Sequence, residues 1–367
     1  MKIIVLTSSR ADYGIYLPLL KKLKVDTFFN LKIVAFGTHL SKKFGNTIDQ
    51  ILKDGFEVAY KIETLLDGDS PETIAKSMAV TIDKFSSLWA KEKSNIDLIL
   101  CVGDRYEMFA AVTASVPFII PVAHLHGGET TLGAIDNVFR HSITSMSKLH
   151  FASTKNHADR VAQIIGSKNG VYNVGALSLD NLMDIKILSV QQFKEKFNIE
   201  LNAPALVTFH PETIAFEKND QYISELIAAL DTLPKQIIIT MPNADTMSNL
   251  IRNKLREFAK QKSNVISVES LGTEGYFSCL HHCSFVLGNS SSGIIEAASF
   301  GKYVLNLGNR QLGRDVGENV IQCEIKKNKI LDAVKLIDTL PKLNTTNIYG
   351  DGHTADKIIS TLKIAAK

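Results

Sequence analysis

Short apolar runs alternate with stretches of helical periodicity along the first half of the chain. The apolar runs are rich in Val, Ile and Leu and end at glycine or polar residues, which is typical of strands. They predict strands at 2–8, 31–37, 96–102, 118–124 and 148–153. The apolar residues between them recur every three or four positions and predict helices near 14–25, 71–93, 105–115, 136–147 and 155–165. This alternation indicates a doubly wound α/β domain with a parallel sheet.

The same alternation restarts in the second half and predicts a second α/β domain. Its expected strands lie near 204–209, 236–241, 265–268, 284–288 and 303–307, and its helices near 220–232, 246–261, 274–282, 292–300 and 326–338. The first sheet is expected to close with the run Val171–Gly175, so the predicted domains cover 1–174 and 175–348, with the change near 172–182. The last segment, 349–367, is predicted to be a capped helix with no strand after it.

Chain length and composition agree with two folded domains. The 367 residues exceed the roughly 250–300 at which one hydrophobic core stops growing. Their 45% hydrophobic and 22% charged residues are typical of soluble globular proteins. Because Met1–Leu6 lacks signal-peptide features and no apolar run reaches the roughly 18 residues of a membrane span, we expect a cytoplasmic protein without membrane contact. The formal charge of +3 argues against nucleic-acid binding but is compatible with a small anionic ligand.

The cysteines and histidine pairs do not predict a metal site. The cysteines are Cys101, Cys279, Cys283 and Cys323. No two of them form a CxxC pair, so we expect buried thiols without disulfides. His281 and His282 stand between two of the cysteines, where a helix with a buried face is a simpler interpretation than zinc. His124 and His126 have the spacing of metal ligands but lack a clear third ligand, so neither a metal nor a cofactor is predicted.

Polar residues directly after apolar strands are candidate site residues, because ligands of open α/β sheets bind outside the carboxyl ends of the strands. Arg10 follows the first strand at a helix start, where backbone amides and a guanidinium suit a phosphate. An ordinary turn with Asp12 as helix cap would explain the segment equally well. Asp104 follows the strand 96–102 and could act as acid or base, although helix capping is the more frequent use of Asp there.

The densest polar cluster follows the strand that ends at Val122–Leu125. It contains His126 and Glu129, and the two glycines between them allow a ligand to approach the backbone closely. The next helix carries Asp136 and Arg140, whose i, i+4 spacing places them on the same side. This density of polar groups favours a functional site over an ordinary loop.

In the second half, His210 ends the opening strand, at a position that matches that of Arg10 in the first half. Catalytic and structural roles both remain open for this histidine. The segment Pro242–Asp245 follows the next strand and could either face the same cleft or serve as turn residues.

The segment Gly288–Gly293 is the strongest candidate for ligand binding. An apolar strand leads into this loop of glycine, asparagine and serine at a predicted helix start, where amides, hydroxyls and the positive helix end can bind a diphosphate. Glu296, one turn further on, can accept hydrogen bonds from the two hydroxyls of a ribose. The loop does not match GxxxxGK[ST], which argues against ATP-type chemistry with magnesium. The alternative is a serine-rich helix cap.

The order and spacing of these segments resemble those of the hydrolysing UDP-N-acetylglucosamine 2-epimerases of sialic-acid and legionaminic-acid biosynthesis. The resemblance covers nearly the whole chain. It rests on Ser9–Tyr13, Gly103–Arg105, His124–Glu129, Arg140–His141, His210–Thr213, Pro242–Thr246, Gly288–Gly293 with Glu296, and Arg310–Arg314.

This resemblance implies the glycosyltransferase-B architecture: two Rossmann-like domains, with the sugar and catalytic groups on the first, UDP on the second, and a terminal helix that returns to the first. It implies that UDP-N-acetylglucosamine loses UDP by elimination to 2-acetamidoglucal, to which water adds to give N-acetylmannosamine. Close relatives act on UDP-2,4-diacetamido-2,4,6-trideoxy sugars, and a UDP-sugar glycosyltransferase is the alternative from another class. The resemblance implies a homodimer or homotetramer that binds a UDP-sugar without a cofactor.

The resemblance also implies roles for individual residues. Asp104, Asp136 and His210 match acid-base positions, and His126, where many relatives have glutamate, completes the predicted catalytic set. The predicted substrate and UDP contacts are Arg10, Arg105, Arg140, Gly288, Ser290, Ser291, Glu296 and Arg314. Non-hydrolysing relatives have a lysine shortly after the arginine of the first loop, and this chain has Tyr13–Ile15 there. The absence of that lysine fits the hydrolysing branch.

Overall fold

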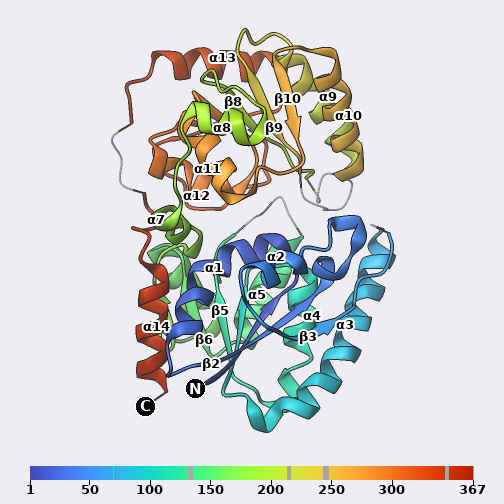
Figure 1. Ribbon diagram of the computed structural model, residues 1–367, viewed down its shortest axis with the longest axis vertical. Helices are drawn as coiled ribbons and strands as arrows, with labels where there is room; N and C mark the ends of the chain where they lie inside the picture. The colour runs from blue at the N-terminus through green and yellow to red at the C-terminus, as the bar shows by residue number, and fades with distance from the viewer. Residues whose placement is uncertain are drawn as a thin grey trace. The chain divides into compact units, whose positions relative to one another are not determined.

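The computed structural model describes residues 1–68, 70–130, 132, 135–212, 216–242, 248–343 and 347–366. The chain forms two compact α/β units (Figure 1). The first contains residues 1–129, Asp136–Met183 and the segment from Tyr349 onward, and the second contains Asp184–Ile348. The described residues between Glu129 and Asp136 group with the second unit.

The first unit is built on a seven-stranded sheet with the order β3-β2-β1-β4-β5-β6-β7. Every pairing in it is parallel. The strands are β1 (Lys2–Thr7), β2 (Asn30–Phe36), β3 (Val58–Ile62), β4 (Leu98–Val102), β5 (Val122–Leu125), β6 (Leu149–Ala152) and β7 (Val171–Asn173). The helices are α1 (Arg10–Val25), α2 (Ile48–Lys53), α3 (Pro71–Glu92), α4 (Tyr106–Thr113), α5 (Asp136–Met146), α6 (Lys155–Ile165) and α14 (Thr354–Ala365), and the short α7 (Asn181–Asp184) ends at the limit of the unit.

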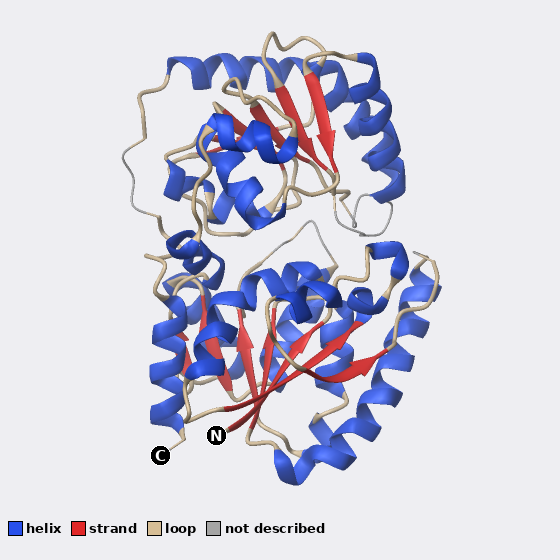
Figure 2. Ribbon diagram, viewed as in Figure 1, coloured by secondary structure: helices blue, strands red, loops and turns tan. Residues whose placement is uncertain are grey.

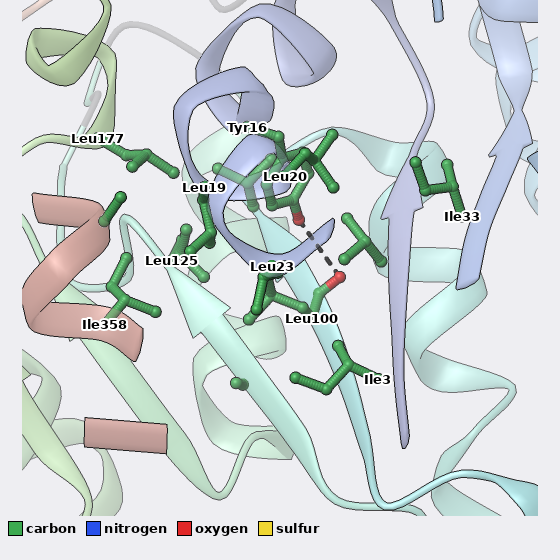
Figure 3. Close-up of a cluster of buried hydrophobic side chains, with 14 of the residues drawn as sticks. Ile3, Tyr16, Leu19, Leu20, Leu23, Ile33, Leu100, Leu125, Leu177 and Ile358 are labelled. Carbon is green, nitrogen blue, oxygen red and sulfur yellow. Dashed lines mark hydrogen bonds between the residues drawn. The ribbon is translucent and has the colours of Figure 1, made fainter. Parts of the chain in front are cut away.

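Alternate residues of β1 point into two different helical layers. Ile3 and Val5 belong to the core cluster that includes α1 and α14, whereas Ile4 and Leu6 belong to the cluster with α3 and α4. This follows from the two-residue repeat of a strand that is buried on both faces. In the first cluster, the hydroxyl of Tyr16 donates to the carbonyl of Leu100 at 3.3 Å, so the polar end of a fully buried ring is satisfied (Figure 3).

The second unit has a six-stranded parallel sheet with the order β10-β9-β8-β11-β12-β13, and helices lie on both of its faces (Figure 2). Its strands are β8 (Ala205–Thr208), β9 (Ile237–Thr240), β10 (Val265–Val268), β11 (Phe285–Gly288), β12 (Val304–Leu307) and β13 (Val320–Cys323). Its helices are α8 (Val190–Phe197), α9 (Asn219–Leu230), α10 (Ser248–Gln261), α11 (Gly272–His282), α12 (Ser291–Ile295) and α13 (Lys327–Thr339). The prediction of two parallel-sheet α/β domains is therefore confirmed.

The first unit continues to Met183, beyond the predicted boundary after Val174. Leu177 packs in the same core cluster as α1 and α14. The buried carboxylate of Asp180 accepts hydrogen bonds from the first two backbone amides of α14, Thr354 at 2.8 Å and Ala355 at 2.7 Å. These contacts hold both the connector and the terminal helix on the first unit.

Several predicted elements differ from the structure. The edge strands β3 and β13 and the helix α2 were not predicted. The predicted strand 118–124 begins too early, because Val116–Phe118 form a 3-10 turn and β5 starts at Val122. The predicted helix 292–300 is the short α12 followed by a 3-10 helix at Ala297–Phe300. The start of the predicted helix 246–261 lies outside the described residues.

Candidate functional site

At the carboxyl end of β1, the chain turns directly into α1. Ser9 is the N-cap of α1, and its side chain accepts a hydrogen bond from the amide of Asp12. Asp12 itself does not cap the helix; its carboxylate accepts from the amide and the hydroxyl of Ser8 at 2.9 and 2.6 Å. Arg10 is the first residue of α1 and is exposed. The turn is thus held by Ser8, Ser9 and Asp12, and Arg10 projects from it into solvent.

The carboxyl ends of β4 and β5 bring four charged or titratable side chains together. Arg140 of α5 is buried and forms an ion pair with Asp104, the second residue after β4. The same guanidinium donates to the carbonyl of His126 at 2.9 Å and lies 3.6 Å from the carboxylate of Glu129. Glu129 is also bonded to Nδ1 of His126 at 2.7 Å and accepts from the hydroxyl of Ser153 at 2.8 Å. This acid-base cluster therefore joins two strand ends through one arginine.

Of the predicted residues in the first unit, the structure brings Asp104, His126 and Arg140 into this cluster. Asp136 is the first residue of α5 and is half-buried. Glu129 belongs to the polar cluster predicted from the sequence but had no predicted role, although it contacts two residues that had one. The available signal was a carboxylate three residues after a histidine, across a glycine pair that lets the chain turn back.

Arg105, next to Asp104, forms an internal ion pair. Its guanidinium donates to both carboxylate oxygens of the buried Glu107, at 3.2 and 3.0 Å. Burial lowers the pKa of His39 to about 4, and the positive charge of Arg105 contributes in the same direction. Arg105 is therefore oriented at the carboxyl edge of the sheet by Glu107.

Three histidines of the first unit are held in the neutral form. Burial lowers the pKa of His124 to about 3 and the pKa values of His39 and His150 to about 4, from an ordinary value of 6.5. Neutral His124 bridges the carbonyl of Gly103 at 2.8 Å and the hydroxyl of Thr144 at 3.2 Å, so it helps fix the loop that carries Asp104. The unfolded chain binds protons at these side chains below about pH 6.5, whereas the folded unit binds them only at lower pH.

We therefore expect the first unit to lose stability as the pH falls below about 6.5, by up to about 1.4 kcal/mol per pH unit for each neutral histidine. Urea unfolding at pH 7.5, 6.5 and 5.5 would measure this loss. The fluorescence of Trp89 can follow it, because this single tryptophan is buried in the first unit. Equal stability at pH 6.5 and 5.5 would contradict the neutral burial of these histidines.

In the second unit, Asn289 organises the carboxyl ends of β8 and β11. Its side chain exchanges two hydrogen bonds with the backbone of His210: the His210 amide donates to it at 2.6 Å, and it donates to the His210 carbonyl at 2.8 Å. The backbone carbonyl of Asn289 accepts hydrogen bonds from the side chains of Arg310 at 3.2 Å and Gln311 at 2.8 Å. The buried His210 is thereby fixed to the segment Gly288–Gly293, which we call the glycine-serine loop, and to the segment that carries Arg314.

The last residue of β11, where the chain leaves the sheet, must be glycine. Gly288 has φ 144°, and a Cβ there would lie 1.9 Å from the carbonyl oxygen of Thr208. Ser290 is the N-cap residue of α12, and Ser291 is its first residue. Both serines are only half-buried, whereas Glu296, at the other end of α12, is buried. Hydroxyls and a carboxylate thus lie at opposite ends of one helical turn.

The second unit brings His210, the glycine-serine loop and the segment Arg310–Arg314 together around Asn289. Asn289 and Gln311 were not selected as site residues from the sequence. Arg314 is half-buried, and its amide donates to the carbonyl of Gln311 at 3.2 Å. The candidate residues Asn243 and Asp245 and the residue Thr213 lie outside the described residues.

The described residues contain no group of three or more His, Cys, Asp or Glu side chains that could hold a metal ion. The four cysteines are buried free thiols. In the described parts of the chain, every helix is too short or too polar to cross a membrane.

A family model described as UDP-N-acetylglucosamine 2-epimerase matches residues 21–363. The chain belongs to this family. It is 34% identical over 364 residues to the UDP-N,N'-diacetylbacillosamine 2-epimerase (hydrolyzing) of Legionella pneumophila, covering 99% of this chain and 95% of the relative. It is 34% identical over 339 residues to polysialic acid biosynthesis protein P7 of Escherichia coli, covering 91% of this chain and 85% of the relative.

Among solved structures, this 2-epimerase family member resembles the UDP-GlcNAc 2-epimerase of Neisseria meningitidis bound to UDP-GlcNAc. The two have a TM-score of 0.84 and 19% sequence identity, over 99% of this chain and all of the other. At this identity the comparison concerns the fold, and it confirms the predicted glycosyltransferase-B-like architecture.

Proposed function

We propose that this protein is a hydrolysing 2-epimerase, which converts a UDP-linked 2-acetamido sugar and water into UDP and the free 2-epimeric sugar. The observation that carries this proposal is the acid-base cluster of Asp104, His126, Glu129 and Arg140. Such chemistry needs groups that move protons at fixed positions, and this cluster holds a carboxylate and an imidazole on a buried scaffold. Membership of the 2-epimerase family supports the same reaction class.

In the proposed reaction, the C2–H bond of the sugar breaks and its electron pair forms a C1–C2 double bond. The C1–O bond to the diphosphate breaks at the same time, and its electron pair leaves with UDP. Water then adds across the double bond with a proton returned to C2, which gives the epimer. Asp104, His126, Asp136 and His210 are the proposed proton-transferring groups, because these steps need both an acid and a base.

UDP is proposed to bind through arginines and the glycine-serine loop. Arg10, Arg105 and Arg314 would stabilise the departing diphosphate, since charge develops there as the C1–O bond breaks. Gly288, Ser290 and Ser291 would offer backbone amides and hydroxyls to phosphate oxygens, and Glu296 would accept hydrogen bonds from the ribose. The internal contacts of Arg140 support a different role, in which it holds Asp104 and Glu129 in place.

The relative from Legionella pneumophila makes UDP-N,N'-diacetylbacillosamine the first substrate to test, because that match covers more of both chains than the match to protein P7. UDP-N-acetylglucosamine is the second, from the description of the family. The two sugars share the 2-acetamido group at the reacting centre and differ further round the ring. The proposed chemistry is therefore the same for both.

Incubation of the full chain with each UDP-sugar and water alone tests the proposal. We expect release of UDP together with the free 2-epimeric sugar from one of the two substrates, measured by chromatography and proton NMR. In D₂O, the product should carry deuterium at C2, because the proton removed from C2 exchanges before one is returned. Release of UDP with retained C2 configuration and no deuterium, or turnover only when a sugar acceptor is added, would contradict a hydrolysing epimerase.

A further inference from the structure

The two ring nitrogens of His126 have different surroundings. Nδ1 lies 2.7 Å from a carboxylate oxygen of Glu129. Nε2 is buried and has no hydrogen-bond partner among the residues that the structure describes. Because an ionised carboxylate can only accept, this contact assigns the proton of a neutral His126 to Nδ1 and leaves a lone pair on Nε2. A buried lone pair of this kind can accept a proton from a bound substrate.

Glu129 is itself fixed on several sides. Its side chain is 2% exposed, one oxygen accepts from the hydroxyl of Ser153 at 2.8 Å, and the other lies 3.6 Å from Arg140. The hydroxyl of Ser153 also lies 2.9 Å from Nδ1 of His157, which extends the network to α6. A carboxylate held in this way has little freedom to rotate away from His126, so the orientation of the imidazole is set by its surroundings.

The backbone of His126 is held in an unfavourable conformation. Its φ is +64°, in the left-handed region that side chains other than glycine rarely adopt. Its amide donates to the carbonyl of Phe151 at 2.9 Å, and its carbonyl accepts from Arg140 at 2.9 Å. Strain that the surroundings maintain on both sides of one residue is a feature of functional positions. Here it directs the imidazole toward Glu129.

We infer that Glu129 is a positioning residue, which holds His126 as the Nδ1–H tautomer so that Nε2 is the nitrogen that takes and returns a proton during turnover. This inference rests on the proposed function. When Nε2 takes a proton from the substrate, the imidazole becomes an imidazolium, and the carboxylate of Glu129 balances the new charge through Nδ1–H. When Nε2 returns the proton, the starting tautomer is restored. Arg140 joins this pair to Asp104, so both acid-base groups are held by one guanidinium.

Glu129→Gln tests the role of the carboxylate, because it keeps the shape of the side chain and removes its charge. We expect kcat to fall at least about tenfold with KM changed by less than about twofold, since the loss affects proton transfer rather than binding. The acidic limb of the kcat profile should move to lower pH, because the imidazolium formed at His126 during turnover loses its anionic neighbour. Among the described residues, Arg140 and His124 also lie beside His126, and Asp104 is joined to it through Arg140; all three are retained in the variant.

Glu92→Gln is the matched control. Glu92 is also a buried carboxylate of the first unit, and it is paired with Lys32 and Tyr60 away from the acid-base cluster. This variant is expected to lose stability without any shift of the pH profile. If Glu129→Gln keeps the wild-type profile, or if Glu92→Gln shifts it equally, Glu129 has a structural role and the inference is overturned.

His126→Asn provides a second test that does not depend on the folding of the Glu129 variant. Asparagine tolerates a left-handed φ, and its amide N–H can replace Nδ1–H beside Glu129, but it has nothing in the place of Nε2. We expect a folded protein with KM near that of wild type and turnover lower at least about tenfold. Turnover like that of wild type would overturn the role of Nε2.

Nitrogen-15 NMR of histidine-labelled wild type reads the tautomer directly, and the signal missing from His126→Asn identifies His126. The Nδ1–H form is expected, and the Nε2–H form would overturn the inference even in an active enzyme. Conversely, the protein could show the Nδ1–H form and yet epimerise neither UDP-sugar. The assignment of the tautomer would then be correct, and the proposed function would be wrong. The two failures are therefore distinguishable.

Discussion

Asp104→Asn is expected to lower turnover of the UDP-sugar between about tenfold and 10⁴-fold, with UDP binding close to that of wild type. Asparagine keeps an oxygen that can accept from Arg140, so the ion pair becomes a hydrogen bond and the loop after β4 should keep its position. What is lost is a group that can take or give a proton. Positioned acid-base groups contribute about 10² to 10⁴ to the rate, which is the origin of the expected range.

Asp97→Asn is a matched control for this prediction, because Asp97 directly precedes β4 and Asp104 follows the same strand. Asp97 accepts from the amide of Lys2 at 2.7 Å at the amino-terminal edge of the sheet, where ligands of this fold do not bind. Its turnover should equal that of wild type. Calorimetric titration with UDP and steady-state kinetics would measure both variants. Unchanged turnover of Asp104→Asn would remove this residue from the catalytic set and leave it as the partner of Arg140.

The buried strands could be predicted from sequence because both of their faces contact helices. β4 and the residues Ile3–Leu6 of β1 are continuous apolar runs, since each of these side chains lies in a core whichever way it points. β3 and β13 are edge strands and give a weaker signal. β3 has the sequence VAYKI and no buried residue, so its apolar residues are interrupted by lysine and it lacks an apolar run.

The candidate site was predictable only in part, for a physical reason. Asp104, His126 and Arg140 could be selected because each follows a strand or lies on a helix whose face is set by periodicity. The role of Glu129 depends on the positive φ of His126, which turns the chain so that the carboxylate reaches Nδ1. Likewise, the bonds of Asn289 to the His210 backbone join segments far apart in sequence. The contacts of Asn289 come from tertiary structure and leave no local pattern, whereas Glu129 left a short one, a carboxylate three residues after a histidine.

Gly288→Ala is expected to destabilise the second unit by about 3 kcal/mol or more and to abolish UDP binding at concentrations that saturate wild type. The added Cβ would lie 1.9 Å from the carbonyl oxygen of Thr208 and 2.7 Å from its carbonyl carbon. These are backbone atoms of β8, the neighbouring strand, which pairs with β11 as far as Gly288 and Thr208. Relief of the clash requires the two strands to separate where both deliver candidate site residues, His210 from β8 and the glycine-serine loop from β11.

Gly272→Ala separates this clash from backbone strain alone. Gly272 lies in the same unit and also has a positive φ, of 62°, but a Cβ there would have no neighbour within 4 Å. Gly272→Ala should lower the free energy of unfolding of the second unit by only about 1–2 kcal/mol, the penalty for alanine in a left-handed conformation. Its affinity for UDP should equal that of wild type. Urea unfolding followed by circular dichroism would measure stability, while Trp89 fluorescence reports on the first unit separately. If Gly288→Ala binds UDP as well as Gly272→Ala does, the loop after β11 tolerates displacement and does not grip the diphosphate. That result would assign diphosphate binding to the arginines, because guanidinium groups attract phosphate without a fixed loop.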